Sequence, residues 1–474
     1  MAPVTRRATA PSAGRLAERI VLYGFLAIVF LAPLPFGSNR PWSWSMLSLS
    51  VGGLLFLWAV AAWRAPDLVR VPATWHLPLT IPFVLFLLWV AVQAASWTPA
   101  SWHHEAWAEF EAMLGHDFAG AISLNPEDSW TEMMRIIAYG GAFWLAMQLG
   151  RERANAVLLT ETIVAATGLY AFYGLVVYFS GNDFVLWYPK WANPEVLTGT
   201  FVGRNNYATY AGMGVVVGLA MVFREIRNTA RHDVLTRHSF FDLTEKLRLR
   251  AFLLGLAVLL NGFALLLTQS RGGFLATLAG VMTFGFVIMR RRQVGLRTWI
   301  LSLGGLLVAV AFFMQIAGAG LVSRLGQTET GEADSRSEAY ALSLEVIRDH
   351  PWIGTGLGTY QEVFHRYRDR DMSSLTPDSD HAHNTYLELW LETGLIGFVL
   401  LMSPIVLVTL AVARAAITRR RSYTFPAAAL GVAVLVGVHA LADFSVEMPA
   451  VALTFAALLG LGYSQSRHVG EEFT

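Results

Sequence analysis

The 474-residue sequence contains no cysteine and few charged side chains. The absence of cysteine excludes disulfides and thiolate metal sites. Asp, Glu, Lys and Arg make up 15% of the residues, whereas a soluble domain carries about 25%. The formal net charge is +1, so no strong field of one sign indicates nucleic acid as a partner.

Apolar residues take the place of the missing charges, at 55% of the chain and a mean hydropathy of +0.47. They form continuous runs of about 20 residues, the length that crosses a bilayer, rather than the short alternating segments of a closed β-barrel. The sequence therefore predicts an all-α, polytopic membrane protein with about twelve transmembrane helices. The expected spans are 20–36, 44–62, 77–96, 130–149, 156–179, 206–223, 251–268, 272–289, 299–318, 394–413, 425–442 and 448–465.

The basic residues are distributed unevenly between the connections of these spans. If the N-terminus is cytoplasmic, the short outer loops hold only Arg40, Lys190, Arg204 and Arg271, and most other arginines lie inside. This bias agrees with the positive-inside rule and predicts that both termini are cytoplasmic. The expected divisions are a basic, uncleaved tail (1–19), nine spans (20–318), a long outer loop (319–393) and three spans with a short tail (394–474).

Two outer segments exceed the length of a simple connection. In the long loop, SRSEAYALSLEVIRDHP predicts an amphipathic helix along the membrane surface, with Tyr340, Leu344 and Ile347 on one face. Residues 97–129 carry several acids and no Lys or Arg, and their role is open.

Three costly residues are expected at the outer ends of helices that run inward. Arg204 lies in GTFVGRNNYATYAG, Arg271 in LLLTQSRGGFLA, and His383 in the TPDSDHAHN segment. A helix N-terminus presents free N–H groups and a partial positive charge, so such ends with nearby arginines form an anion site. This arrangement suits a lipid-linked phosphate or diphosphate. The expected helix caps are Asn205 and Asn206 after Arg204, and Ser270 before Arg271.

Other interpretations of these residues stay open. Each arginine alone also fits an interfacial residue whose head reaches water, and His383 fits a hydrogen-bonded histidine. Asp378, Asp380, His381 and His383 resemble ligands of a divalent metal, which would suit a metal-dependent membrane hydrolase, but no second ligand group with suitable spacing lies nearby. We therefore expect no metal.

A lipid-glycan flippase or transporter would also place arginines near the membrane surface. Such a protein usually has related halves, and no internal repeat is visible here. The sequence GTGLGTY, residues 354–360, is a weak nucleotide motif and is expected to form a turn. Asp443 and Glu447 are expected in a hydrated turn, with a lesser alternative that they line the cavity.

Several motifs resemble the O-antigen ligase and O-antigen polymerase superfamily of bacterial inner-membrane glycosyltransferases. They are GRNNYA, QSRGG, and SRSEAYALSLEVIRDHPWIGTGLGTYQEVF followed by HAHNTYLELWLETGLIGF, within Phe201 to Phe398. The resemblance implies a GT-C-like enzyme that transfers a glycan from undecaprenyl diphosphate to an acceptor sugar hydroxyl at the periplasmic face of the inner membrane. The transfer is expected to be inverting and independent of metal and cofactor. The acceptor would be lipid A–core or another lipid-linked glycan, so ligase and polymerase are not separated.

The resemblance also implies roles for individual residues. Arg204 and Arg271 are expected to hold the diphosphate, and His383 to act as general base. Arg336, a loop arginine, would contact sugar or phosphate. His381, Asp380 or Asn384 is expected to orient the ring of His383. The residues expected to contact substrate also include His381, Asn384, Asn205, Asn206 and Ser270.

Overall fold

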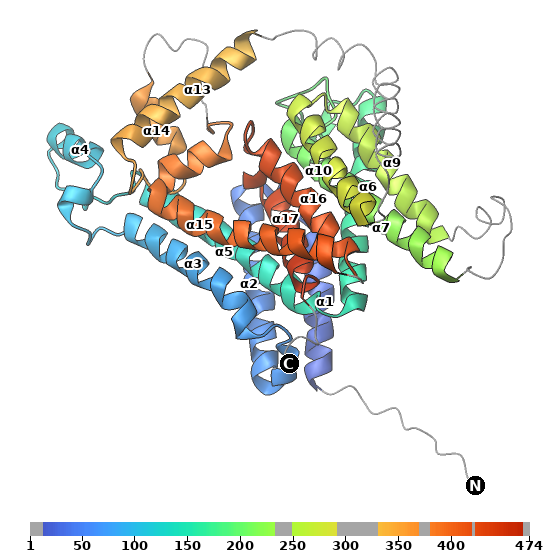
Figure 1. The fold of residues 1–474 in the computed structure, drawn as a ribbon. Coiled ribbons are helices and arrows are strands. Elements are labelled where there is room, and N and C mark those ends of the chain that lie inside the picture. The colour runs from blue at the N-terminus through green and yellow to red at the C-terminus, as the bar shows by residue number, and fades with distance from the viewer. Residues whose placement is uncertain (1–12, 233–248, 292–329, 369–379, 420–421, 468–474) are drawn as a thin grey trace.

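The computed structural model describes residues 13–232, 249–291, 330–368, 380–419 and 422–467. Helices form nearly all of the regular structure in these residues (Figure 1). The described strands are β1 (Phe184–Val185) and β2 (Tyr188–Pro189), which pair as a short antiparallel ribbon. A predominantly helical fold is therefore confirmed.

Eleven of the expected spans coincide with described helices. They are α1 (Ala13–Leu31), α2 (Pro41–Arg64), α3 (Ala73–Gln93), α5 (Pro126–Leu149), α6 (Arg153–Phe179), α7 (Arg204–His232), α9 (Leu249–Leu267), α10 (Arg271–Arg291), α15 (Thr385–Thr418), α16 (Thr424–His439) and α17 (Pro449–Ser464). The expected span 299–318 lies outside the described residues. Seven described helices are long and apolar enough to cross a membrane, namely α2, α3, α6, α7, α9, α10 and α15. The chain is a multi-pass membrane protein, and a total of twelve spans stays a prediction.

The interior of the bundle is formed by α5, α7, α16 and α17. Helix α17 packs along α5, and α7 contacts α6, α9, α10 and α16. Gly280 of α10 and Gly431 of α16 allow a close backbone approach, because a Cβ on either residue would meet the carbonyl oxygen of the other. By contrast, α2 and α3 leave many apolar side chains exposed, as expected of helices that face lipid.

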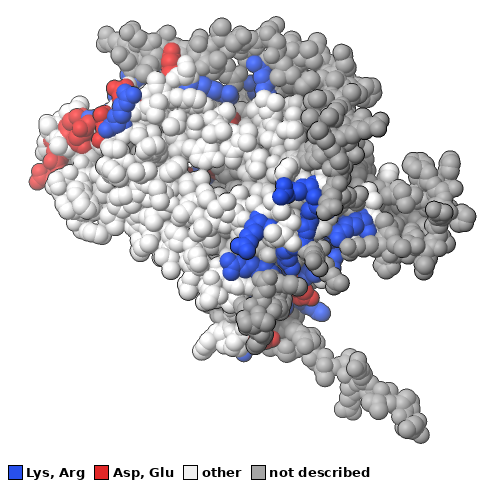
Figure 2. All heavy atoms as spheres, viewed as in Figure 1, with Lys and Arg blue, Asp and Glu red and all other residues white. Residues whose placement is uncertain are grey.

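Basic residues gather at the end of the bundle away from the long loop. Figure 2 shows Lys and Arg side chains clustered on this part of the surface, below a broad uncharged area. Arg227 and Arg291 both lie over the ring of Tyr423, and Arg291 donates a hydrogen bond to the Ile417 carbonyl. Acidic side chains gather instead at the tip that carries α4 (Ala106–Leu114).

The described part of the long loop contains α13 (Thr330–Asp349) and α14 (Tyr360–Tyr367), which pack on the start of α15 (Figure 1). The predicted helix is present, and of its predicted apolar face Ile347 is buried whereas Leu344 is exposed. Leu344 is 44% exposed, whereas Ala339, Leu342 and Val346 are buried. The reason is that α14 and α15 cover this side of α13, so the helix buries the face that meets them.

Helix α15 breaks at Gly394, close to the predicted end of the loop, where φ is 64° and ψ is 179°. The GTGLGTY turn fills the break. The N–H groups of Thr355 and Gly356 donate to the carbonyls of Leu391 (3.2 Å) and Glu392 (2.8 Å), and the Leu395 N–H donates to the Pro351 carbonyl (3.0 Å). Backbone groups freed by the break are thereby paired, and the motif serves as a turn, as predicted.

The acidic segment 97–129 also packs on the long loop. It contains η3 (Ala100–Trp102) and α4. Arg366 of α14 pairs with Glu105 at 3.0 Å and Glu109 at 2.7 Å, and the His104 ring stacks on His350 with centroids 5.0 Å apart. Segment 97–129 and the described part of the long loop therefore pack on each other.

We predict that Gly394→Ala lowers the melting temperature of the purified protein. This combination of φ and ψ is nearly exclusive to glycine, and such strain costs about 1–3 kcal/mol. An added Cβ would also lie 2.1 Å from the Trp352 carbonyl oxygen. Gly52→Ala in α2 is the control, because nothing lies within 4 Å of its Cβ and alanine favours a helix. Equal melting temperatures for the two variants would contradict the assignment.

Candidate active site

The turn between α16 and α17 brings the predicted site residues together. Asp443, which is 1% exposed, accepts a hydrogen bond from Asn205 Nδ2 (2.6 Å) and lies with Oδ2 4.0 Å from His383 Nδ1. The Ser445 hydroxyl donates to its other oxygen. One buried carboxylate thus joins the start of α7 to the segment that precedes α15, and the expected hydrated turn at Asp443 is wrong.

The start of α10 is linked through hydrogen bonds to Asn205, the residue that binds Asp443. Ser270 Oγ accepts from the Gly273 N–H (3.1 Å), which caps α10 as predicted, and donates to Asn205 Oδ1 (2.7 Å). Arg204 and Arg271 are the first residues of α7 and α10, and both are half-buried. Their helix ends are therefore neighbours, linked by the Ser270 to Asn205 hydrogen bond.

The predicted capping role of Asn205 and Asn206 is wrong. Helix α7 begins at Arg204, and the Tyr207 N–H donates to the Gly203 carbonyl, so both asparagines lie within the first turn. Asn205 bridges to Asp443 and Ser270 instead. Asn206 is buried, and its Oδ1 has no hydrogen-bond partner among the described atoms.

His383 lies two residues before α15 in a strained conformation, with φ at 54°. Such a conformation in a non-glycine residue is uncommon and concentrates at functional sites. Its Nδ1 is buried without a hydrogen bond, yet 36% of the side chain is exposed. Burial lowers the pKa of His383 below its ordinary value; Asp443 opposes this effect and Arg336 adds to it. The imidazole is therefore neutral near pH 7.

Helix α13 reaches the same site. The Tyr340 hydroxyl donates to the His383 carbonyl (3.1 Å) and lies 3.5 Å from the Leu441 carbonyl. Arg336, one turn earlier, is close enough for its charge to lower the pKa of His383. The structure therefore brings Arg336 near the histidine.

His439 is a member of the site that sequence reasoning missed. Its Nδ1 lies 2.5 Å from Thr209 Oγ1 of α7, and a Cβ on Gly272 would lie 3.0 Å from its Nε2. Glycine at position 272 thus lets the first turn of α10 approach the ring. The only sequence signal was a histidine at the end of an apolar run.

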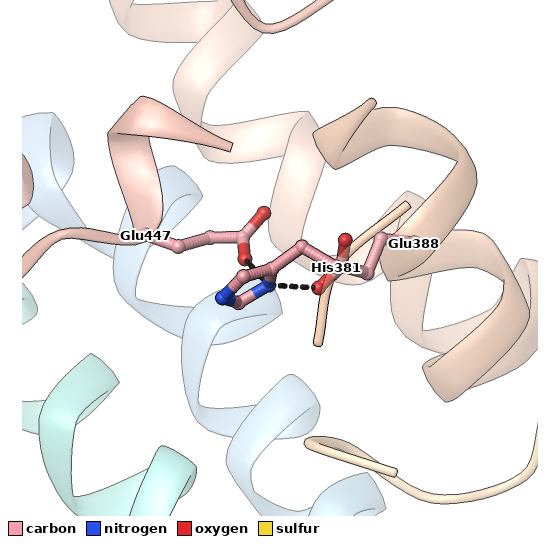
Figure 3. Close-up of side chains that lie close together, drawn as sticks. All are labelled: His381, Glu388 and Glu447. Carbon is pink, nitrogen blue, oxygen red and sulfur yellow. Dashed lines mark hydrogen bonds and ion pairs between the residues drawn. The ribbon is translucent and has the colours of Figure 1, made fainter. Parts of the chain in front are cut away.

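His381 belongs to a separate cluster beside the site. Figure 3 shows its ring between Glu388 and Glu447, whose oxygens lie 2.7 Å and 3.0 Å from Nδ1. Burial alone would lower the pKa of His381, but the two carboxylates raise it well above its ordinary value. Burial would likewise raise the pKa of Glu447, but the interaction with His381 lowers it. At neutral pH His381 is therefore a cation held by carboxylate.

This cluster changes the predicted roles of His381 and Asn384. His381 stacks on Phe444 at 4.0 Å and faces the glutamates, and the carboxylate beside His383 Nδ1 is that of Asp443. Asn384 is the N-cap of α15, since its Oδ1 accepts from the N–H groups of Tyr386 and Leu387. Glu447, expected in a hydrated turn, also accepts a hydrogen bond from Thr385 Oγ1 (2.9 Å).

Arg135 extends the cluster into α5. It forms a salt bridge with Glu132, donates to the Glu447 carbonyl (2.7 Å) and lies over the Trp44 ring at 5.1 Å. A buried arginine inside a span is costly unless it is paired, and these three partners explain why α5 tolerates it.

The alternative metal set is not supported by its described members. Asp378 lies outside the described residues, Asp380 is exposed, and the two histidines face different partners. Within the described residues, His381, Glu388 and Glu447 place ligand-type atoms within 4.8 Å of one another. Glu388 Oε2 also accepts from the Ala382 N–H (2.7 Å), so each of the three residues has protein partners of its own.

Comparison with known proteins agrees with the motifs. A protein of Haemophilus influenzae named only as uncharacterized is 26% identical over 180 residues, which cover 36% of this chain and 44% of that relative. The aligned part thus spans less than half the length of the relative. Residues 256–402 match the family model described as O-antigen ligase, a range that includes Arg271, Arg336 and His383. Over that range the chain is similar to the O-antigen ligase family, which supports the resemblance seen in the motifs.

Proposed function

We propose that this protein transfers a glycan from undecaprenyl diphosphate to an acceptor sugar hydroxyl at the periplasmic face of the bacterial inner membrane. The proposal rests on one observation above all, the convergence of the helix starts at Arg204 and Arg271 with His383 around Asp443. The transfer is independent of metal, and it is either a ligation or a polymerisation.

Arg204, Arg271 and the starts of α7 and α10 bind the diphosphate. Negative charge grows on this leaving group as its bond to the sugar C1 breaks, so fixed positive groups stabilise the transition state more than the ground state. Arginine suits the task because its planar fork binds phosphate oxygens in pairs and stays charged. Arg336 adds a third positive group next to His383.

His383 accepts the proton. The acceptor oxygen attacks C1 opposite the leaving diphosphate, the new C1–O bond forms as the old one breaks, and the hydroxyl proton moves to the imidazole, with inversion at C1. His381 and His383 differ in their ability to accept this proton. His381 is held as a cation and has no lone pair to offer, whereas His383 is neutral and partly exposed. Environments that push two pKa values apart mark the division of acid and base roles.

Asp443 is a positioning residue. Its carboxylate lies 4.0 Å from His383 Nδ1, so it stabilises the imidazolium that forms when the other ring nitrogen takes a proton. The same carboxylate holds Asn205 at the start of α7. The general base and the diphosphate site are therefore both positioned by the buried carboxylate of Asp443.

The acceptor is lipid A–core or a second lipid-linked glycan. Arginine side chains cluster at the end of the bundle away from the long loop (Figure 2). This clustering supports a cytoplasmic position for that end of the bundle, with both termini inside and the active site outside. An arginine pair at one end of the bundle suits transfer better than transport, since a flippase needs access from both sides.

We predict that Arg271→Ala slows glycan transfer by about a hundredfold, because loss of one transition-state partner costs about 3 kcal/mol. Arg271→Lys restores only part of the rate, since lysine keeps the charge and loses the fork. The measurement is transfer from a purified lipid-linked glycan by protein in lipid nanodiscs. A single addition per acceptor indicates a ligase, and a ladder of products indicates a polymerase.

Arg290→Ala is the matched control, because Arg290 lies in the last turn of the same helix, away from the site. It is expected to retain the wild-type rate. Near-normal transfer by Arg271→Ala would remove this residue from the mechanism. A chelator is expected to have no effect, and a loss of activity restored by a divalent ion would favour a metal-dependent enzyme that uses the His381, Glu388 and Glu447 cluster.

We predict that kcat is flat near neutral pH and falls as pH drops through the lowered pKa of His383, below about 6.5. The sign follows from the need for a neutral base. Asp443 raises this pKa, so Asp443→Asn is expected to move the acid limb to still lower pH and to reduce kcat. An acid limb that stays in place, or moves to higher pH, would show that Asp443 acts only on structure.

A further inference from the structure

An open groove of about 820 Å³ lies between the starts of α2 and α5. Two tryptophans, two carboxylates and two hydroxyls line it, namely Trp44, Trp130, Glu127, Asp128, Ser45 and Thr131. Trp130 is 46% exposed, and Glu127 is exposed as well. None of the described lining residues is Lys or Arg.

These lining residues fit a sugar without phosphate. The apolar face of a pyranose ring packs on an indole, and its hydroxyls donate hydrogen bonds to carboxylates. Asn125 Nδ2 donates a hydrogen bond to the Asp128 carboxylate at 2.6 Å, which fixes the position of this carboxylate. A phosphate would meet two carboxylates, and no described lining residue is a cation, so the groove disfavours the diphosphate end of a substrate.

The groove is connected to the active site by shared side chains. Arg135 lies over Trp44 at 5.1 Å on one side and donates to the Glu447 carbonyl on the other. Asn125 Nδ2 also donates to Glu362 of α14 (2.7 Å), and Ser129 Oγ donates to the Leu357 carbonyl (2.7 Å). The wall of the groove is therefore built on the elements that carry the cluster of His381 and the GTGLGTY turn.

We propose that this groove binds the acceptor glycan, and that it selects a neutral or amine-bearing saccharide over a phosphorylated one. The inference rests on the proposed glycan transfer and adds to it a binding site for one substrate. Diphosphate and acceptor then occupy separate regions, with cations around Arg204 and Arg271 for the first and indoles with carboxylates for the second.

The test is Trp130→Ala in nanodiscs, assayed with donor and acceptor varied separately. We expect the KM for the acceptor to rise about tenfold, while kcat and the KM for the donor stay at wild-type values. Glu127→Gln is expected to weaken the preference for neutral over phosphorylated acceptors. Trp42→Ala is the control, since Trp42 is also exposed on the first turn of α2 but does not line the groove.

Direct binding separates this proposal from the proposed enzyme. Saturation-transfer NMR with a neutral hexose pentasaccharide is expected to show contact with wild-type protein and little with Trp130→Ala, whether or not transfer occurs. The same pentasaccharide carrying a phosphate monoester is expected to bind more weakly. Equal acceptor KM values for Trp130→Ala and Trp42→Ala would overturn the proposal. So would a groove that binds phosphatidylethanolamine, seen as a lipid-dependent melting temperature that Trp130→Ala abolishes.

Discussion

The rest of the site depends on the interactions of the buried Asp443 carboxylate. A carboxylate out of water is costly unless hydrogen bonds and nearby positive groups compensate. Here the compensation comes from hydrogen bonds donated by Asn205 of α7 and by Ser445 in its own turn. Asn205 also accepts a hydrogen bond from Ser270. The interactions of the Asp443 carboxylate therefore also fix the starts of α7, α10 and α15 relative to one another.

A second buried charge network supports the loop side of the site. His381 lies between Glu388 of α15 and Glu447 of the turn before α17, and Arg135 of α5 binds the Glu447 backbone. The His381 cation and the Glu447 carboxylate compensate each other, and removal of one would leave its partner buried and unpaired. The two histidines of the HAH sequence therefore differ in function through their surroundings alone. One is a structural cation, and the other keeps a neutral ring at an exposed edge of the site.

Much of the architecture was predictable from the sequence because hydropathy depends on single segments. Long apolar runs predict α2, α6 and α15, and the place of Ser270 before a helix predicts that it caps this helix. Residues whose importance depends on distant partners were not predictable. Asp443, Glu447 and His439 stand alone near turns, and nothing local shows that they meet residues 66 to 238 positions away. The set of residues that α13 buries was not predictable for the same reason, since the helices that cover it are set by tertiary packing.

The most direct measurement is a cryo-EM structure of the protein in nanodiscs with undecaprenyl diphosphate bound. The account predicts density for the diphosphate within hydrogen-bonding distance of both Arg204 and Arg271, with the exposed edge of His383 facing the position of the sugar C1. A diphosphate bound elsewhere, or guanidinium groups of Arg204 and Arg271 directed to separate sites, would contradict it.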